Sequence, residues 1–197
     1  MVLPSHRHCP SLVLNASAGD IMTPLPSQMS REAFVEHFGG VYEHSPWIAL
    51  GLFDTGLSAL VDTPSGLSQA MIDIVAQAGH EPQLALLRSH PDLAGRLAVS
   101  GELTVASFAE QSGAGLDQCT PAQFSAFNEL NARYTQKFGF PFIVAVRGLD
   151  REGILACFHK RVENDFDTEF NEALAQVHRI ARLRIDTLFT EMDVLAS

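Results

Sequence analysis

Apolar residues along most of this chain recur three and four positions apart, the spacing that places side chains on one face of an α-helix. The pattern begins after Ser30, reappears over residues 65–78, and resumes around 154–162. Its longest stretch covers about 167–192, where positions 170, 174, 177, 181, 184 and 188 share one stripe. A length of 197 residues suits one domain with a real core, so the sequence predicts a single, compact, all-α domain.

Residues 140–146, FPFIVAV, are the exception to this pattern. Their β-branched and aromatic content is typical of a buried strand, but no second convincing strand exists to pair with it. Gly139 ends the preceding helix, which begins at a capping box formed by Thr120 and Gln123. We therefore expect one short extended segment inside a helical protein.

The first 28 residues differ from the rest of the chain. They carry four prolines, scattered histidines and serines, and no sustained period, which favours a loosely ordered leader. Met29 could be the natural start, and residues 29–197 are expected to form the domain.

Composition excludes several classes of protein. A formal charge of −10, from 13 Lys plus Arg against 23 Asp plus Glu, makes nucleic acid an unfavourable partner. The three cysteines are widely spaced without a CxxC pair, which argues against a disulfide framework and a structural zinc site. No apolar run approaches the ~20 residues that cross a bilayer. We expect a cytoplasmic protein with no membrane partner.

His90 is the first candidate for chemistry. A residue before proline is disfavoured in the α region, so Pro91 should end the helix through 84–87 and leave His90 at its carboxyl end. That end of a helix favours imidazolium, which would make His90 an acid near neutral pH. The alternative is an ordinary hydrogen-bonded or surface histidine.

Thr104 is expected to cap a helix that carries Ser107, Glu110 and Gln111 on one face. These side chains could hydrogen-bond a polar heterocycle while Glu110 orients His90. The alternative is a solvated helix face. His90 and Glu110 could also bind a metal, but nothing supplies a third ligand, so no metal is predicted.

Arg184 lies on the apolar stripe of the last helix. Burying a guanidinium is costly unless acceptors meet it, so Arg184 should face a protein carboxylate or a bound anion. Arg182, on a more polar face, is the lesser candidate. A GxSxG nucleophile elbow and a P-loop are both missing, which disfavours a serine hydrolase and a phosphate cradle.

Five motifs, which follow one another in this order along the chain, resemble those of one family. They are EHSPW (43–47), SHPDLAG (89–95), the LT, S, EQ and AGL pattern (103–116), the N, Y and KFGFPF run (131–142), and I followed by LR (180–184). Together they resemble 2-oxo-4-hydroxy-4-carboxy-5-ureidoimidazoline (OHCU) decarboxylase, over about residues 30–188.

The resemblance implies an all-helical, cofactor-free carboxy-lyase that converts OHCU to (S)-allantoin and CO2 in urate degradation. It places the catalytic groups on His90, as proton donor, and Glu110. It also implies a homodimer. The substrate-binding positions that it implies are Pro91, Ser107, Gln111, Arg184 and the main chain of Phe142, Ile143, Val144, Ala145 and Val146, whose unpaired amides and carbonyls would face the ring.

The implied chemistry suits these residue types. Loss of CO2 leaves an electron pair that the substrate's own C=N bond can accept, and a positioned acid then supplies a proton. A metal-free hydrolase or lyase of a related ureide would use the same His90 and Glu110 differently. A helical interaction module without catalysis is the third hypothesis.

Overall fold

The computed structural model describes residues 24–94 and 103–195 of the chain. Within these ranges every regular element is helical and no strand occurs, which confirms the predicted all-α class. The α-helices are α1 (Arg31–Phe38), α2 (Trp47–Asp54), α3 (Pro64–Gln77), α4 (His80–Arg88), α6 (Val105–Gly113), α7 (Pro121–Phe138), α8 (Arg151–Arg161) and α9 (Phe166–Leu195). Short 3-10 helices are η1 (Pro26–Gln28), η2 (Ala59–Asp62) and η3 (Leu116–Gln118).

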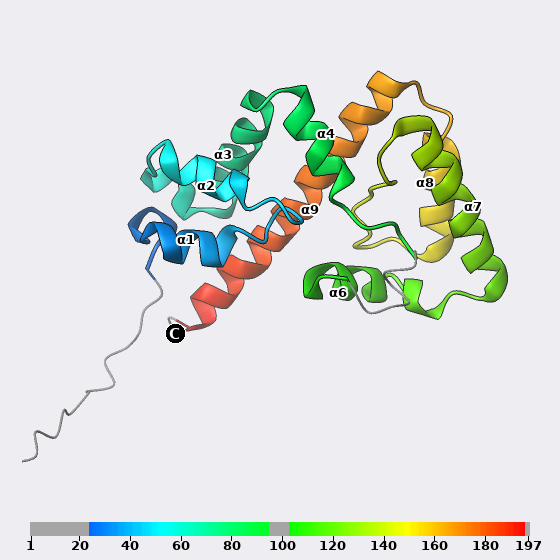
Figure 1. The fold of residues 1–197 in the computed structure, drawn as a ribbon. Coiled ribbons are helices and arrows are strands. Elements are labelled where there is room, and N and C mark those ends of the chain that lie inside the picture. Colours follow the sequence, from blue (N-terminus) through cyan, green and yellow to red (C-terminus); the bar gives the residue numbers. More distant parts are fainter. Residues whose placement is uncertain (1–23, 95–102, 196–197) are drawn as a thin grey trace, which may run out of the picture.

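The long helix α9 runs diagonally through the molecule and separates two groups of helices (Figure 1). Helices α1, α2 and α3 gather around its C-terminal part, whereas α7 and α8 lie beside its beginning. Helix α4 crosses α9 between the two groups and contacts it. Helix α4 thus packs on α9 between the two groups.

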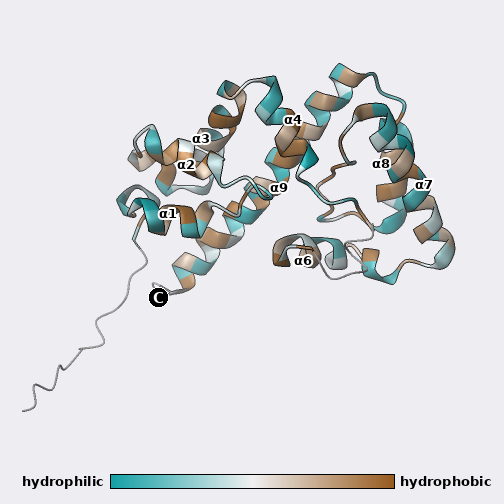
Figure 2. Ribbon diagram, in the orientation of Figure 1, coloured by the Kyte–Doolittle hydropathy of each residue, from teal (hydrophilic) through white to brown (hydrophobic). Residues whose placement is uncertain are grey.

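The core follows the three-four spacing of the sequence. On α9 the buried side chains include Leu174, Val177, Ala181 and Ile185. Burying leucine, valine and isoleucine side chains stabilises the fold by roughly 1.5–3 kcal/mol each, and the smaller side chain of Ala181 contributes less. Along α9 the hydrophobic residues alternate with hydrophilic ones, as the banding in Figure 2 shows. The periodic pattern therefore predicts the packing face of this helix.

Side-chain caps begin several helices where the sequence places them. The hydroxyl oxygens of Ser30 and Thr104 each accept a backbone N–H of the first turn, from Ala33 and Ser107 respectively. Thr120 and Gln123 form the predicted capping box. Gly139 ends α7 with φ of 75°, a left-handed conformation that costs glycine little.

The segment 140–146 is extended and has no strand partner, as expected. It is buried rather than exposed, and the ring of Phe142 stacks on that of Phe158, with centroids 3.8 Å apart. Buried side chains on both sides of its backbone explain why a strand-like composition occurs without a sheet.

Regular structure begins before Ser30, the first helix cap that the sequence predicts. Residues 1–23 of the expected leader lie outside the described residues, but Pro26–Gln28 form a turn of helix and Pro26 is buried. Both the backbone N–H and the hydroxyl of Ser27 donate to the carboxylate of Asp62, each at 2.8 Å. The last residues of the expected leader therefore pack on the domain. No helix in the described ranges is long and apolar enough to cross a membrane.

Candidate active site

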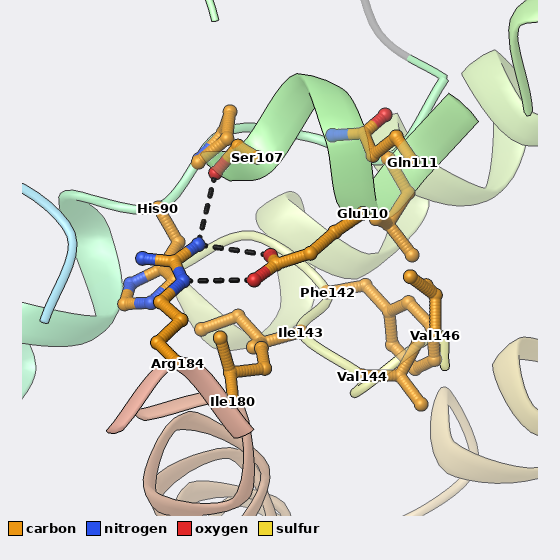
Figure 3. A pocket seen from close by; sticks show the side chains of 12 residues that line it. His90, Ser107, Glu110, Gln111, Phe142, Ile143, Val144, Val146, Ile180 and Arg184 are labelled. Atoms are coloured by element: carbon orange, nitrogen blue, oxygen red, sulfur yellow. Dashed lines mark hydrogen bonds and ion pairs between the residues drawn. The ribbon is translucent and has the colours of Figure 1, made fainter. Parts of the chain in front are cut away.

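His90 lies two residues beyond α4, as the proline rule predicts. Its Nδ1 is 2.9 Å from the carbonyl oxygen of Leu86. A carbonyl can only accept, so Nδ1 carries the proton and donates, and the neutral ring keeps its lone pair on Nε2. This bond holds the ring at the edge of the pocket drawn in Figure 3.

Burial lowers the pKa of His90. The hydrogen bond to Leu86 and the charges of Glu43 and Glu110 raise the pKa, but they do not overcome the burial. The expectation that the helix end would favour imidazolium is therefore wrong for the protein without substrate. The cost of removing a charged ring from water exceeds the gain at a helix terminus.

Helix α6 contributes Ser107, Glu110 and Gln111 to the pocket. Ser107 and Gln111 are buried, so a solvated helix face is excluded for these two residues. The side-chain oxygen of Gln111 accepts the backbone N–H of Ala94 at 3.1 Å. This bond ties α6 to the loop that carries His90, because Ala94 follows it by four residues.

Arg184 joins α9 to α6. Its Nε and Nη2 donate to the two carboxylate oxygens of Glu110 at 2.8 and 2.9 Å (Figure 3). Nη2 also lies 3.3 Å from the hydroxyl of Ser107. Arg184 was expected to face either a protein carboxylate or a bound anion, and in the structure it faces protein carboxylates. The expected pairing of Glu110 with His90 is not what the structure shows, because both Glu110 oxygens accept from the stronger, permanently charged donor.

Glu43 is a second carboxylate on Arg184, and sequence reasoning gave it no role. Its Oε2 accepts from Nη1 of Arg184 at 2.8 Å, and its side chain is 1% exposed. The signal available in the sequence was the motif EHSPW, which begins with this residue. A single glutamate in a loop does not by itself reveal a partner 141 positions away.

The extended segment forms the opposite wall of the pocket, through Phe142, Ile143, Val144 and Val146. Ala145, which was expected to take part, does not line it. Its backbone N–H donates to the side-chain oxygen of Gln176 at 2.9 Å. This bond directs the backbone N–H of Ala145 toward α9.

The carbonyl of Ile143 is also occupied. It accepts from Nη1 of Arg161 at 2.6 Å. The expectation of wholly unpaired backbone groups along this segment is therefore wrong for Ile143 and Ala145. It is also wrong for Val146, whose carbonyl accepts the backbone N–H of Leu149 at 2.9 Å. The groups of Ile143 and Ala145 hold the segment in place through α8 and α9.

One pocket thus collects His90, Glu110 and Arg184 from three separate elements, and the residues that line it are His90, Pro91, Leu93, Ser107, Glu110, Gln111, Phe142, Ile143, Val144, Val146, Ile180 and Arg184. Leu93 and Ile180 are lining residues that were not predicted as site residues, although both lie in the quoted motifs. The cavity measures about 30 Å³, less than a ureide needs. A larger hollow of about 340 Å³ adjoins it, and Glu110 and Arg184 line both. The ion pair therefore lies between the two spaces.

Arg182, the lesser candidate, does not line the pocket. It pairs with Asp186 one turn along α9, at 2.9 Å and half-exposed. In the described part of the chain no group of three or more His, Cys, Asp or Glu side chains is arranged to hold a metal ion.

Comparison with known proteins identifies the family. The sequence profile of OHCU decarboxylase matches residues 27–186. The chain belongs to the OHCU decarboxylase family. A 2-oxo-4-hydroxy-4-carboxy-5-ureidoimidazoline decarboxylase of Haloferax volcanii is 41% identical over 164 residues, which are 83% of this chain and 94% of the relative. The resemblance stated from the five motifs is confirmed, and with it the predicted carboxy-lyase class of urate degradation.

Solved structures share the fold of this family. A crystal structure of (S)-allantoin synthase has a TM-score of 0.67 and 33% identity, covering 83% of this chain and 52% of that chain. A crystal structure of OHCU decarboxylase in the presence of (S)-allantoin has a TM-score of 0.61 at 24% identity, covering 76% and 95%. The all-α architecture is therefore that of OHCU decarboxylases.

Proposed function

We propose that this pocket decarboxylates OHCU to (S)-allantoin and CO2, with His90 as the proton donor. The observation that carries the proposal is the meeting of His90, Glu110 and Arg184 at one cavity. An imidazole, a carboxylate and a guanidinium are the groups that this reaction needs. They come from the loop after α4, from α6 and from α9, so only the folded chain assembles them.

Arg184 binds the anionic end of the substrate. Its Nε and Nη2 form the planar edge that matches a carboxylate, and Glu110 occupies that edge in the structure. A substrate carboxylate exchanges with Glu110 at this edge. The exchange opens the wall between the small cavity and the adjoining hollow, and it frees Glu110 to accept a hydrogen bond from the substrate hydroxyl.

His90 then moves the proton. When the bond between the ring carbon and the carboxylate breaks, CO2 leaves and the electron pair enters the adjacent C=N system. The substrate's negative charge raises the pKa of His90 and favours its protonation. His90 delivers this proton from one face to the carbon that becomes the stereocentre. The hydroxyl proton passes, by way of Glu110, to the nitrogen that received the electron pair, so the new carbonyl and a neutral N–H form together.

The test is the substitution His90→Ala. We expect the rate of (S)-allantoin formation from freshly generated OHCU to fall by at least about 10²-fold, the usual contribution of a positioned acid. Circular dichroism of the product measures the rate and the stereochemistry together. The matched control is His159→Ala, an exposed histidine on α8, which should keep wild-type turnover.

Two outcomes contradict different parts of the proposal. Full activity of His90→Ala would remove the histidine from the mechanism. A wild-type protein that forms optically active allantoin no faster than the uncatalysed reaction would refute the activity itself.

A homodimer and a cytoplasmic location also remain proposals, supported by the family resemblance. Sedimentation equilibrium of the purified chain tests the first. Fractionation of cells that produce it tests the second.

A further inference from the structure

We propose that Glu43 is a positioning residue for the decarboxylation, because it holds Arg184, helix α6 and the His90 loop in one fixed arrangement. The inference rests on the proposed function. Glu43 does not line the cavity that His90 shares with Glu110 and Arg184; it borders a separate hollow of about 180 Å³ that His90 also lines. We therefore place its action on Arg184 rather than on the substrate.

The contacts of Glu43 reach three elements. Its carboxylate Oε1 accepts from the hydroxyl of Thr104, the residue that caps α6, at 2.6 Å. Its Oε2 accepts from Arg184 of α9 at 2.8 Å. Its backbone carbonyl lies 2.9 Å from the hydroxyl of Ser89, the neighbour of His90. One loop residue thus connects every element that supplies a charged group to the pocket.

The two carboxylates on Arg184 differ in their surroundings. The side chain of Glu43 is 1% exposed, whereas that of Glu110 is 26% exposed. Glu110 takes the Nε edge, next to the pocket, and Glu43 takes Nη1 on the far side. Glu110 and Arg184 together line two cavities, and Glu43 lines neither of these two. Glu43 is therefore the permanent partner of the guanidinium and Glu110 is the exchangeable one.

The ionisation of Glu43 suits a permanent partner. Burial by itself would raise the pKa of this carboxyl group, but the hydroxyl of Thr104 and the charge of Arg184 outweigh it and lower the pKa. Glu43 therefore stays charged throughout the neutral range. Because its carboxylate stays charged, Glu43 can keep the guanidinium of Arg184 in one orientation when Glu110 gives up its hydrogen bonds to Arg184.

The backbone next to Glu43 is strained. His44 has φ of 48°, in the left-handed region that costs a residue with a side chain roughly 1–2 kcal/mol. Such conformations persist where the surrounding structure determines them, often at functional sites. Here the strained residue directly follows the carboxylate that reaches Thr104 and Arg184.

Positioning and simple electrostatics predict opposite results. Removing a negative charge from beside Arg184 would strengthen binding of an anionic substrate if only Coulomb forces mattered. If Glu43 instead orients the guanidinium, the same change lets Arg184 turn and weakens productive binding. The sign of the effect on kcat/KM therefore decides between them.

The experiment is Glu43→Gln, which keeps the side-chain shape and removes the charge. We expect kcat/KM for OHCU to fall roughly ten- to hundredfold, the loss of one charge-assisted hydrogen bond, with most of the change in KM. The matched control is Glu163→Gln, which breaks the exposed ion pair with Arg133 and should leave the kinetics unchanged. Unchanged or increased kcat/KM in Glu43→Gln would overturn the proposal.

A double-mutant cycle with Arg184→Ala separates positioning from a general structural effect. If Glu43 acts through Arg184, Glu43→Gln should cause little further loss of kcat/KM when Arg184 is already absent. Equal losses in both backgrounds would refute this route. If Glu43→Gln does not fold, Thr104→Val takes its place, since it frees one oxygen of Glu43 and should still lower kcat/KM several-fold. Wild-type turnover in the same assay shows whether the proposed function itself holds.

The pH profile gives a readout that a purely structural role would not move. The charges of Glu43, Glu110 and Arg184 act on the pKa of His90, and that of Glu43 raises it. Arg88 and His44 line a neighbouring hollow together with His90. In Glu43→Gln the limb of the kcat/KM profile assigned to His90 should shift to lower pH. A limb that stays in place while kcat/KM falls would indicate a purely structural role for Glu43 and contradict the proposal.

Discussion

The imidazole of His90 lies two residues beyond α4, with Nδ1 2.9 Å from the carbonyl oxygen of Leu86. The helix end, the hydrogen bond to Leu86 and the charges of Glu43 and Glu110 would each raise the pKa of His90, yet burial lowers it. The free enzyme therefore holds a neutral ring at neutral pH. Its charged state becomes favourable when the substrate adds negative charge to the pocket.

This lowered pKa predicts a dependence of stability on pH. Below the ordinary histidine pKa of about 6.5 the unfolded chain takes up a proton, whereas folded His90 stays neutral until a lower pH. The free energy of unfolding should therefore fall as the pH drops through and below about 6.5, by at most about 1.4 kcal/mol per pH unit for this group. Urea unfolding at pH 7.5, 6.5 and 5.5 measures the slope.

The control for this prediction is His90→Asn, which does not titrate. His178 also has a pKa lowered by burial, so the wild type and the variant share that contribution. The slope should be shallower in the variant. Identical slopes would show that the folded and unfolded states bind a proton at His90 equally well.

The extended segment 140–146 keeps its position because side chains of two helices hold its backbone. Arg161 of α8 binds the carbonyl of Ile143, and Gln176 of α9 binds the N–H of Ala145. Val144, between these two anchored residues, is one of the residues of the segment that line the pocket. The segment thereby presents one wall of the site without belonging to a sheet.

The substitution Gln176→Leu tests this anchoring. It leaves the buried N–H of Ala145 unsatisfied, which costs roughly 1–3 kcal/mol. We expect faster amide hydrogen exchange along 142–146 and a higher KM, while the exchange of α3 stays unchanged. Exchange followed by mass spectrometry measures the first effect, and steady-state kinetics the second.

The control is Gln69→Leu, on α3, where the side chain donates to Asp73 in an exposed pair. It should leave both measurements unchanged. Unaltered exchange along 142–146 in Gln176→Leu would show that this hydrogen bond does not hold the segment.

At the scale of the whole molecule, a buried ionic cluster around Glu169 holds several helices together. Glu169 itself is 0% exposed. Its carboxylate accepts from Tyr134 of α7, from Arg161 of α8 and from Asn164. Arg161 also lies over the ring of Phe142, 4.6 Å from its centroid. The cluster thus links α7, α8, α9 and the extended segment.

Replacing this carboxylate by an apolar group should destabilise the entire domain. Glu169→Leu leaves Arg161 buried without its counter-charge, which costs roughly 3–5 kcal/mol of the free energy of unfolding. Denaturant unfolding measures the loss. The control Asp186→Asn removes a half-exposed partner of Arg182 and should cost no more than about 1 kcal/mol. A loss in Glu169→Leu as small as in the control would contradict the importance of the cluster.

Local signals in the sequence determined the helices. Apolar spacing defined the buried face of α9, the caps at Ser30, Thr104 and Thr120 defined helix starts, and Pro91 placed His90 just beyond a helix. These features depend on residues a few positions apart, so the chain displays them directly. The five motifs in order were enough to indicate the family.

Only the tertiary structure decided which partners the buried groups take. It paired Glu110 with Arg184 rather than with His90, and it added Glu43 to the same cation. It also turned the N–H of Ala145 to Gln176. These pairs join residues 31 to 141 positions apart, and burial sets their strength. Neither the distance nor the burial is encoded in the spacing of neighbouring residues, because both arise when helices pack together.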